Sequence, residues 1–512
     1  LQLNFFKEVC NCIEYYRGIV NPRKKLILCV DGVAGCAKMA QQRQRRFKAI
    51  KNPENANDME WNPNCLTPGT KLMDHLTKYI EWYIRGNISY NPTWQNLDVI
   101  FSSEKTPGEG EHKIINYIRT QGTENERYCI HGMDADLIML ALGSQKEYMY
   151  ILRENMMNSN EMYILNIGNF SKELVHKLRW NSQEIVEESS ETTSEPISHK
   201  NAPFNPKTAV IDFIFMCFLV GNDFLPTIPT IAILEGGIDS MLDVYKDVCH
   251  TYGHLTRISR KGGDRSITFN MKSLEVFFGT VAQYEKGFLE EKMANRDSFI
   301  EDPLLTKHTT QMYDPEINST KITYNLDFNA YMSDYYTKKF PNEDYACIPE
   351  IACHEYIRGM EWILTYYYRG IPDWKWCYPF FYGPFLQDLA KYTPSYTFTA
   401  FPDNEAILPF MQLLAVLPPS SSDLLPYPCN RILISEASPI RKYYPEDFEV
   451  DYSGKRKEWE GIVILPMVDM NLIEKEYDRC VKNISQGDMY RNNKQQSKVF
   501  TYEDSFYRPF KS

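Results

Sequence analysis

Short hydrophobic runs alternate with longer amphipathic stretches through the first half of the chain. The runs are apolar almost throughout and end in a polar residue or glycine, which predicts buried β-strands. These predicted strands cover residues 26–32, 97–103, 127–134, 148–152 and 161–167. The predicted helices between them cover residues 37–50, 70–86 and 111–121. Alternation of this kind predicts an α/β fold in which a mainly parallel central sheet is flanked by helices.

The second half of the chain has a different pattern. Residues 181–207 are rich in Ser, Thr, Glu and Pro and have almost no apolar content, which predicts a disordered surface insertion. A hydrophobic helix is expected over residues 209–224, and from about residue 240 the pattern predicts helices and irregular, Pro-rich segments. We therefore expect two regions, residues 1–239 and residues 240–512, without an internal repeat.

Composition and charge narrow the class of protein. The net charge of −11 argues against a nucleic-acid coat protein but allows an enzyme with a local basic groove. The 35 Tyr and 27 Phe residues supply rings that either stack on bases or fill a core. The 13 Cys residues are irregularly spaced, which predicts reduced thiols. The longest apolar run, residues 213–220, is too short to cross a membrane. Because no obvious targeting run is present, we expect a cytoplasmic protein, with the nucleus as the alternative.

Acidic residues follow the predicted strands and the hydrophobic helix. They are Asp31 after the first strand, Glu109 and Glu111 after the second, Asp134 and Asp136 after the third, and Asp223 where the helix stops. In a parallel sheet these side chains meet at one edge, where two bare carboxylates about 4 Å apart repel each other by roughly 4 kcal/mol. Hard oxygen ligands without clustered His or Cys favour Mg²⁺ or Mn²⁺. The sequence therefore predicts a metal site, with a helix cap as the alternative role for any single acid.

A basic stretch follows Asp31. Residues 36–50 contain five Lys and Arg residues and no acidic residue. On a helical wheel with Lys38 at zero, Gln42 lies at about 40°, Arg45 at about −20° and Arg46 at about 80°. These four side chains share an arc of about 100° and supply many donors and almost no acceptor, which suits a terminal phosphate. A solvated basic helix is the alternative, but it does not explain why an acidic chain has no acid here.

Six long motifs occur in order along the chain. They are VDGVAGCAKMAQQRQRRF, NCLTPGTKLM, TPGEGEHKIINYIR, GMDADLIMLAL, FLVGNDFLP and YYYRGIPDWKWCYPFFYGP. Together they resemble the XRN family of 5′→3′ exoribonucleases. The similarity continues through residues 409–426 and 438–466, so it extends over nearly the whole chain.

The resemblance implies a PIN/FEN-like nuclease core that degrades single-stranded RNA bearing a 5′-monophosphate, processively, to nucleoside 5′-monophosphates. It implies that the six acidic residues form the catalytic metal site and that Lys38, Gln42, Arg45 and Arg46 hold the 5′-phosphate. Trp374 or Trp376 would stack on a base, with a place in the core as the alternative for either. The second region would complete the RNA channel. Hydrolysis with two Mg²⁺ or Mn²⁺ ions is the expected mechanism, and we expect a monomer that acts in mRNA decay.

The sequence departs from the family at several positions. Gly35 and Cys36 stand where the family usually has Pro-Arg, Ala40 where it has Asn, and Phe381 where it often has His. The family's first catalytic Asp and a stacking His would precede Leu1. If the protein lacks them, a catalytically impaired RNA 5′-end-binding protein is the alternative function. A structure-specific DNA nuclease on a FEN-like core is a third hypothesis.

Overall fold

The computed structural model describes residues 1–51, 62–155, 158–180, 202–231, 236–261, 264–313, 322–340 and 347–504. The elements up to residue 218 are α1 (Gln2–Val20), β1 (Lys25–Cys29), α2 (Cys36–Lys51), α3 (Lys71–Tyr90), β2 (Asp98–Ser102), α4 (Gly110–Gln121), β3 (Tyr128–His131), α5 (Asp136–Gly143), β4 (Met149–Asn155), β5 (Asn158–Asn166), α6 (Ile167–Leu178) and α7 (Pro206–Phe218). The five predicted strands correspond to β1–β5, and the three predicted helices correspond to α2, α3 and α4.

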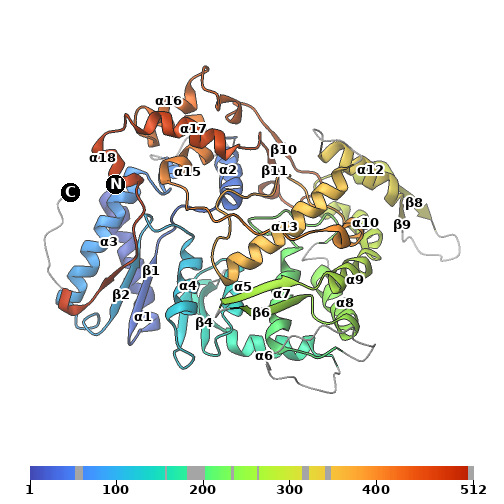
Figure 1. Cartoon of the computed structure of the whole chain (residues 1–512), viewed down its shortest axis with the longest axis horizontal. Helices are drawn as coiled ribbons and strands as arrows, with labels where there is room; N and C mark the ends of the chain where they lie inside the picture. Colours follow the sequence, from blue (N-terminus) through green and yellow to red (C-terminus); the bar gives the residue numbers. More distant parts are fainter. Residues whose placement is uncertain are drawn as a thin grey trace.

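Helices dominate the rest of the chain (Figure 1). The elements after residue 236 are α8 (Gly237–Tyr252), β6 (Thr256–Lys261), β7 (Asp264–Phe269), α9 (Met271–Ala282), α10 (Glu285–Ala294), α11 (Pro303–His308), β8 (Thr309–Tyr313), β9 (Ile322–Leu326), α12 (Phe328–Lys339), α13 (Ile348–Tyr368), α14 (Leu386–Tyr392), α15 (Pro409–Val416), α16 (Cys429–Ile434), β10 (Glu449–Asp451), β11 (Ile462–Ile464), α17 (Met470–Val481), α18 (Gln486–Met489) and β12 (Lys498–Phe500).

The strands of the first half form two three-stranded sheets. In one, β1 pairs with β2 in parallel, and β12 from the end of the chain pairs with β2 antiparallel. In the other, β3 pairs with β4 in parallel and β4 pairs with β5 antiparallel. The α/β class is therefore confirmed, but the described strands do not form one mainly parallel central sheet. The hydrophobic runs located the strands, whereas the choice of neighbour depends on tertiary packing that the runs do not encode.

Three two-stranded antiparallel sheets, β6–β7, β8–β9 and β10–β11, lie in the described part of the second region, where only helices and irregular segments were predicted. In β6–β7, polar residues face one another, as where Arg257 pairs with Thr268 and Ser259 with Ser266. Because these strands lack a continuous apolar run, the hydrophobic pattern did not reveal them.

The hydrophobic helix α7 begins earlier and ends earlier than predicted. The side chain of Asn205 caps it by accepting hydrogen bonds from the backbone N–H groups of Lys207 and Thr208. Residues 206 and 207 are therefore helical and do not belong to a disordered insertion, while residues 181–201 lie outside the described residues. No helix among the described residues combines the length and the apolar character needed to cross a bilayer.

The largest hydrophobic core contains residues from both sides of the expected boundary at residue 239. Ile214 of α7 and Trp362 of α13 are both fully buried in this core. Figure 1 shows α13 crossing the molecule beside α5 and α7, which it contacts. The second region thus packs directly against the elements that carry the predicted site.

One pair of cysteines departs from the predicted reduced state. Cys429 of α16 and Cys480 of α17 form a disulfide. The prediction of reduced thiols throughout is wrong for this pair. The two residues are 51 positions apart in the sequence and meet only because α16 packs on α17, so their spacing carried no signal.

Candidate active site

Lys38 in the first turn of α2 forms ion pairs with two of the predicted acidic residues. Its ammonium lies 2.6 Å from Glu109 Oε2 and also contacts Asp223 Oδ2. Burial disfavours the charged ammonium, but the two carboxylates outweigh burial and raise the pKa of Lys38. The basic helix and the acidic residues, which were predicted independently, are therefore in direct contact.

The loop before α4 is fastened to the end of β1. Gly32 N–H donates to Gly108 O at 2.9 Å, and Gly108 N–H donates to Val33 O at 2.8 Å. Gly108 has a φ of 103°, a left-handed conformation that glycine adopts without strain. Gly110 N–H donates to Asp31 Oδ1 at 2.7 Å. These bonds place Asp31 against the first turn of α4, beside the acidic residues of that helix.

Glu109, at the N-cap of α4, is buried, and its two oxygens have different partners. Oε2 pairs with Lys38, and Oε1 accepts a hydrogen bond from the Tyr366 hydroxyl at 3.0 Å. The Tyr366 ring stacks on His112, with centroids 3.7 Å apart and 5° between the planes. Burial lowers the pKa of His112 well below its usual value, so its imidazole is neutral. Tyr366 thereby connects α13 of the second region to the acidic residues.

Glu111 lies in the first turn of α4, where the negative charges of several neighbouring carboxylates act on it. Burial raises the pKa of Glu111 to about 8, and the negative charges of Glu109, Asp136 and Asp31 add to this effect. A carboxyl group in such surroundings retains its proton near neutral pH unless a cation compensates the charge. The shift therefore reports crowding of acidic side chains from three separate segments.

Asp136 begins α5, and its Oδ1 is buried without a hydrogen-bond partner among the described residues. Burial raises the pKa of Asp136; Lys38 opposes this shift, and Asp223 and Asp134 add to it. Asp134 itself is exposed, two residues earlier. A buried carboxylate oxygen without a donor is a position that a cation would stabilise.

The six predicted acidic residues thus interact electrostatically in one region of the molecule. Within the described ranges, however, no group of three or more His, Cys, Asp or Glu side chains is arranged to hold a metal ion. The contacts of Lys38 give a physical reason, because its ammonium bridges Glu109 and Asp223 where a shared cation would lie. The role of the six residues as metal ligands stays a prediction.

Arg46 and Arg45 differ in their surroundings although both lie on the predicted phosphate-binding face of α2. Arg46 Nη1 donates to Thr67 Oγ1 at 2.7 Å and to Asn64 Oδ1 at 3.3 Å. Its Nε is buried without a partner in the described structure. Burial, with a smaller contribution from Arg45, lowers the pKa of Arg46 to about 10, and Arg45 is exposed. The Nε of Arg46 is therefore a buried donor that lacks an acceptor among the described residues.

Gln42 is held by the second region. Gln412 Nε2 of α15 donates to Gln42 Oε1 at 3.1 Å, while Gln412 Oε1 accepts from Ala34 N–H at 3.3 Å. Arg43 and Lys48, which the helical wheel placed on the flanks, donate instead to backbone carbonyls of the second region, and so fix α2 in position. The roles of Lys38, Gln42, Arg45 and Arg46 toward a phosphate stay predictions.

Trp374 and Trp376 have different surroundings. Trp376 stacks on Trp362 with ring centroids 5.6 Å apart and 30° between the planes, and its indole nitrogen is buried. A Cβ atom on Gly359 of α13 would lie 2.8 Å from Trp376 Cη2, so this ring fills the space over α13. Trp374 is partly buried, and its carbonyl accepts from Cys36 N–H at 2.9 Å, at the start of α2.

Three residues of the site were not predicted from the sequence. Gln41 Nε2 donates to Asp223 Oδ1 at 3.1 Å. It lies about 60° from Lys38 on the helical wheel, so the same periodicity that selected Gln42 would have found it. Tyr366 and Gln412 come from the second region and reach the site only through tertiary packing, which leaves no local signal.

Two family models match the chain. The model described as the XRN 5′-3′ exonuclease N-terminus matches residues 2–155. The model described as the Xrn1 helical domain matches residues 203–327 and 323–507. The second match therefore covers more than half of the 512 residues.

Curated relatives align along nearly all of this chain. The 5′-3′ exoribonuclease 1 of Homo sapiens is 29% identical over 553 residues, covering 97% of this chain and 32% of the relative. The 5′-3′ exoribonuclease 2 homolog of Drosophila melanogaster is 29% identical over 586 residues, covering 94% and 64%. The 5′-3′ exoribonuclease 1 of Saccharomyces cerevisiae is 26% identical over 650 residues, covering 99% and 41%. The chain thus spans less than two thirds of the length of each of these relatives. With both family models matched in order, the chain belongs to the XRN 5′-3′ exonuclease family.

Proposed function

We propose that the protein is a processive 5′→3′ exoribonuclease that hydrolyses single-stranded, 5′-monophosphorylated RNA to nucleoside 5′-monophosphates. The observation that carries the proposal is the contact of Lys38 with Glu109 and Asp223. It shows that the basic face of α2 adjoins the acidic residues. Donors suited to a terminal phosphate and oxygen ligands suited to a hard cation therefore lie side by side. The names of the curated relatives support the same reaction.

Divalent cations, two Mg²⁺ or Mn²⁺ ions, fit the donor set. The residues that would hold them are Asp31, Glu109, Glu111, Asp134, Asp136 and Asp223. The orphaned Oδ1 of Asp136 and the raised pKa of Glu111 both indicate negative charge that lacks a counter-ion. Such ions supply Lewis-acid stabilisation of the phosphoryl oxygens and a more acidic water. Lys38 would leave Glu109 and Asp223 when cations bind, and its ammonium would then be available to the 5′-phosphate.

The basic face of α2 would determine where the RNA begins. Arg46, with its buried and unsatisfied Nε, would donate to the terminal phosphate together with Lys38, Gln42 and the exposed Arg45. By its resemblance to the family, we expect such a site to exclude a cap or a triphosphate. The first phosphodiester would then lie beside the acidic residues, which accounts for the release of single nucleotides.

The second region would complete the RNA channel. Tyr366 of this region hydrogen-bonds to Glu109, and Gln412 hydrogen-bonds to Gln42. The second region therefore holds both an acidic residue and a predicted phosphate-binding residue in place. Of the two tryptophans, we propose Trp374 for base stacking, because Trp376, which packs against the core, already stacks on Trp362. Stacking of this kind is worth about 1–3 kcal/mol per base and is insensitive to sequence.

A second candidate function is supported by one observation. Because the Lys38 ammonium is paired with both Glu109 and Asp223, and because no described group of three ligating side chains is arranged to hold an ion, the protein could bind RNA 5′ ends without cleaving them. In that case Lys38 would permanently replace a cation.

One assay separates the candidates. The protein is incubated with Mg²⁺ and with 5′-monophosphorylated RNA, 5′-triphosphorylated RNA or 5′-monophosphorylated DNA of the same sequence. The proposed function predicts rapid release of mononucleotides from the first substrate alone. Tight binding of that RNA without product would support the non-catalytic 5′-end-binding protein, and equal loss of the DNA would support a DNA nuclease.

A further inference from the structure

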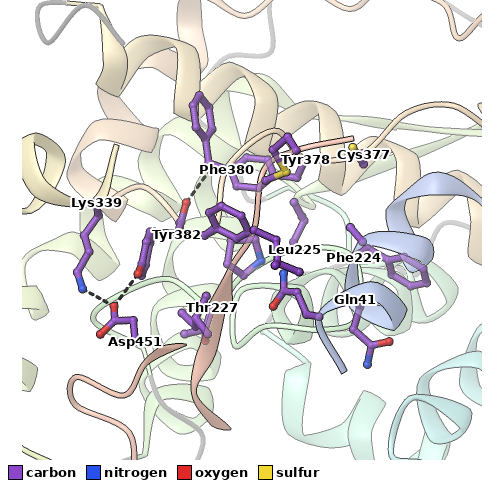
Figure 2. A pocket seen from close by; sticks show the side chains of 18 of the residues that line it. Gln41, Phe224, Leu225, Thr227, Lys339, Cys377, Tyr378, Phe380, Tyr382 and Asp451 are labelled. Carbon is purple, nitrogen blue, oxygen red and sulfur yellow. Dashed lines mark hydrogen bonds and ion pairs between the residues drawn. The ribbon is translucent and has the colours of Figure 1, made fainter. Parts of the chain in front are cut away.

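A cavity of about 340 Å³, shown in Figure 2, adjoins the candidate active site. The residues of α2 that line it lie mainly on the side of the helix that faces away from Lys38. Ala40 and Gln44 line it, and they lie about 160° and 120° from Lys38 on the helical wheel. One end of the cavity is lined by Gln41 and Asp223, which are joined by a hydrogen bond of 3.1 Å. The cavity therefore starts at an acidic residue of the site and extends into the second region.

Aromatic rings form one wall of the cavity. Figure 2 shows Tyr378, Phe380 and Tyr382 lining it from the segment that follows Trp376. The Tyr378 hydroxyl donates to the Tyr382 carbonyl at 3.0 Å, and the Tyr382 hydroxyl donates to Asp451 at 2.6 Å, so the rings have fixed positions. Flat rings held in this way offer surfaces on which a nucleobase can stack.

The end of the cavity far from Asp223 carries lysines. Lys339 is paired with Asp451, as Figure 2 shows. Lys455 also lines this end, and its ammonium has no hydrogen-bond or ion-pair partner among the described residues. Burial and then the neighbouring Lys292 ammonium lower the pKa of Lys455, and the carboxylates of Glu460 and Asp451 only partly oppose this shift. This end of the cavity therefore carries Lys292, Lys339 and Lys455 beside the two carboxylates of Asp302 and Asp451, and the Lys455 ammonium makes no direct ion pair with either carboxylate.

We propose that this cavity is a binding site for a nucleoside 5′-monophosphate, which is the product of the proposed reaction, with the base against the aromatic wall and the phosphate on Lys455. The inference rests on the proposed function. The phosphate would supply the direct ion-pair partner that the Lys455 ammonium lacks. The cavity would thereby receive the released nucleotide on the side of α2 opposite to the 5′-phosphate donors, and leave those donors free for the next RNA end.

The volume favours a single nucleotide over a stretch of polymer. Sites for small molecules commonly enclose roughly 300–1,000 Å³, and this cavity lies at the lower end of that range. A nucleotide within the RNA chain would share the same chemistry, since it also has a base and a phosphate. The two sources differ in one respect that can be measured, because only the free monophosphate can bind without RNA.

The test compares AMP binding and AMP inhibition in the full chain carrying Lys455→Gln, with Lys457→Gln as the matched control. Lys457 is an exposed lysine of the same loop and does not line the cavity. AMP binding is measured by calorimetry, and inhibition is measured on 5′-monophosphorylated RNA at several RNA concentrations. We expect AMP bound in the cavity to lower the maximal rate rather than to compete with the RNA end. Lys455→Gln should weaken this non-competitive component about ten-fold, because a charge-assisted hydrogen bond is lost, and Lys457→Gln should leave it unchanged.

Each outcome has a defined meaning. Purely competitive inhibition by AMP, or AMP binding that is equal in the two variants, would overturn the cavity assignment while RNA degradation still supported the proposed function. Weaker binding of a 5′-hydroxyl RNA oligomer to Lys455→Gln, with AMP binding unchanged, would assign the cavity to the RNA chain and overturn it as a product site. If AMP binding depends on Lys455 but the protein degrades no RNA, the nucleotide site would be supported and the proposed function overturned.

Discussion

The Lys38 ammonium lies 2.6 Å from Glu109 Oε2, so a cation from the basic helix neutralises a buried member of the acidic set. The side chains of Lys38 and Glu109 are 14% and 6% exposed, which removes most of the solvent screening that weakens surface pairs. The same ammonium also contacts Asp223, so it offsets part of the negative charge of two acidic residues, and the state of Lys38 should be sensitive to added cations.

Replacement of Lys38 by methionine should destabilise the metal-free protein. The change leaves the buried Glu109 carboxylate unpaired, and loss of one partner of a buried pair typically costs about 3–5 kcal/mol. Urea unfolding in the presence of a chelator measures the loss, and Mg²⁺ should recover part of it by binding the folded state. Lys172→Met, which removes an exposed pair with Glu147, should cost less than about 1 kcal/mol. Equal, small losses for the two variants would contradict the role assigned to Lys38.

The raised pKa of Glu111 predicts a pH dependence of stability. Its carboxyl has a pKa of about 8 in the folded protein against 4.5 in the unfolded chain, so the folded state holds the proton more tightly. Its contribution to stability is therefore complete below about pH 4.5 and is lost as the pH rises toward 8. Without divalent cations, Glu111→Gln should flatten this fall, whereas Glu173→Gln, at an exposed glutamate, should not. If the free energy of unfolding, measured with urea, had the same pH dependence in the wild type and in Glu111→Gln, the neighbouring carboxylates would not raise the pKa of Glu111.

The close packing of Trp376 on α13 should require a glycine at position 359. A Cβ atom there would lie 2.6 Å from Leu225 Cδ2 and 2.8 Å from Trp376 Cη2. Gly359→Ala should therefore destabilise the protein by about 1–3 kcal/mol through overpacking, despite the better helix propensity of alanine. Gly287→Ala in α10, where a Cβ would meet nothing within 4 Å, should stabilise it by up to about 1 kcal/mol. Thermal unfolding of the two variants gives the comparison, and stabilisation by both would show that Trp376 is free to move.

Arg46 should confer selectivity for the 5′-monophosphate. Arg46→Gln removes a buried cationic donor, and we expect kcat/KM on 5′-monophosphorylated RNA to fall about 10-fold to 100-fold, since hydrogen bonds to charged groups contribute about 1.5–3 kcal/mol. The ratio of kcat/KM for monophosphorylated to triphosphorylated RNA should fall with it. Lys48→Gln, on the flank of α2 with backbone carbonyls as partners, should leave the ratio unchanged. An unaltered ratio in Arg46→Gln would remove Arg46 from the phosphate site.

The local hydrophobic pattern was sufficient to predict where the strands and helices lie in the sequence, but not how they pack together. The apolar runs located β1–β5, and the 3.6-residue period located α2 and the face of it that carries Lys38, because both signals depend only on neighbours in sequence. The split into two sheets and the polar hairpin β6–β7 depend on strand pairing and were missed.

The same distinction applies to the candidate site. Strand ends predicted the acidic residues, and the structure brings these residues together. From the sequence, Lys38 was expected to bind a phosphate, and its contact with Glu109 was not predicted. The hydrogen bonds that Tyr366 and Gln412 of the second region make to the site were not predicted either. Those contacts join residues far apart in the chain, and nothing in the local composition distinguishes the residues involved.

The most direct test of the account is the rate at which Asp134→Ala releases nucleoside monophosphates from 5′-monophosphorylated RNA in Mg²⁺ under single-turnover conditions. Asp134 is exposed, so its loss should leave the thermal unfolding of the protein nearly unchanged. Asp478→Ala, at an exposed aspartate of α17, is the matched control. We expect a loss of about 100-fold or more in Asp134→Ala, as for a ligand of a catalytic ion, and none in the control. Release at the wild-type rate by a folded Asp134→Ala protein would contradict this expectation.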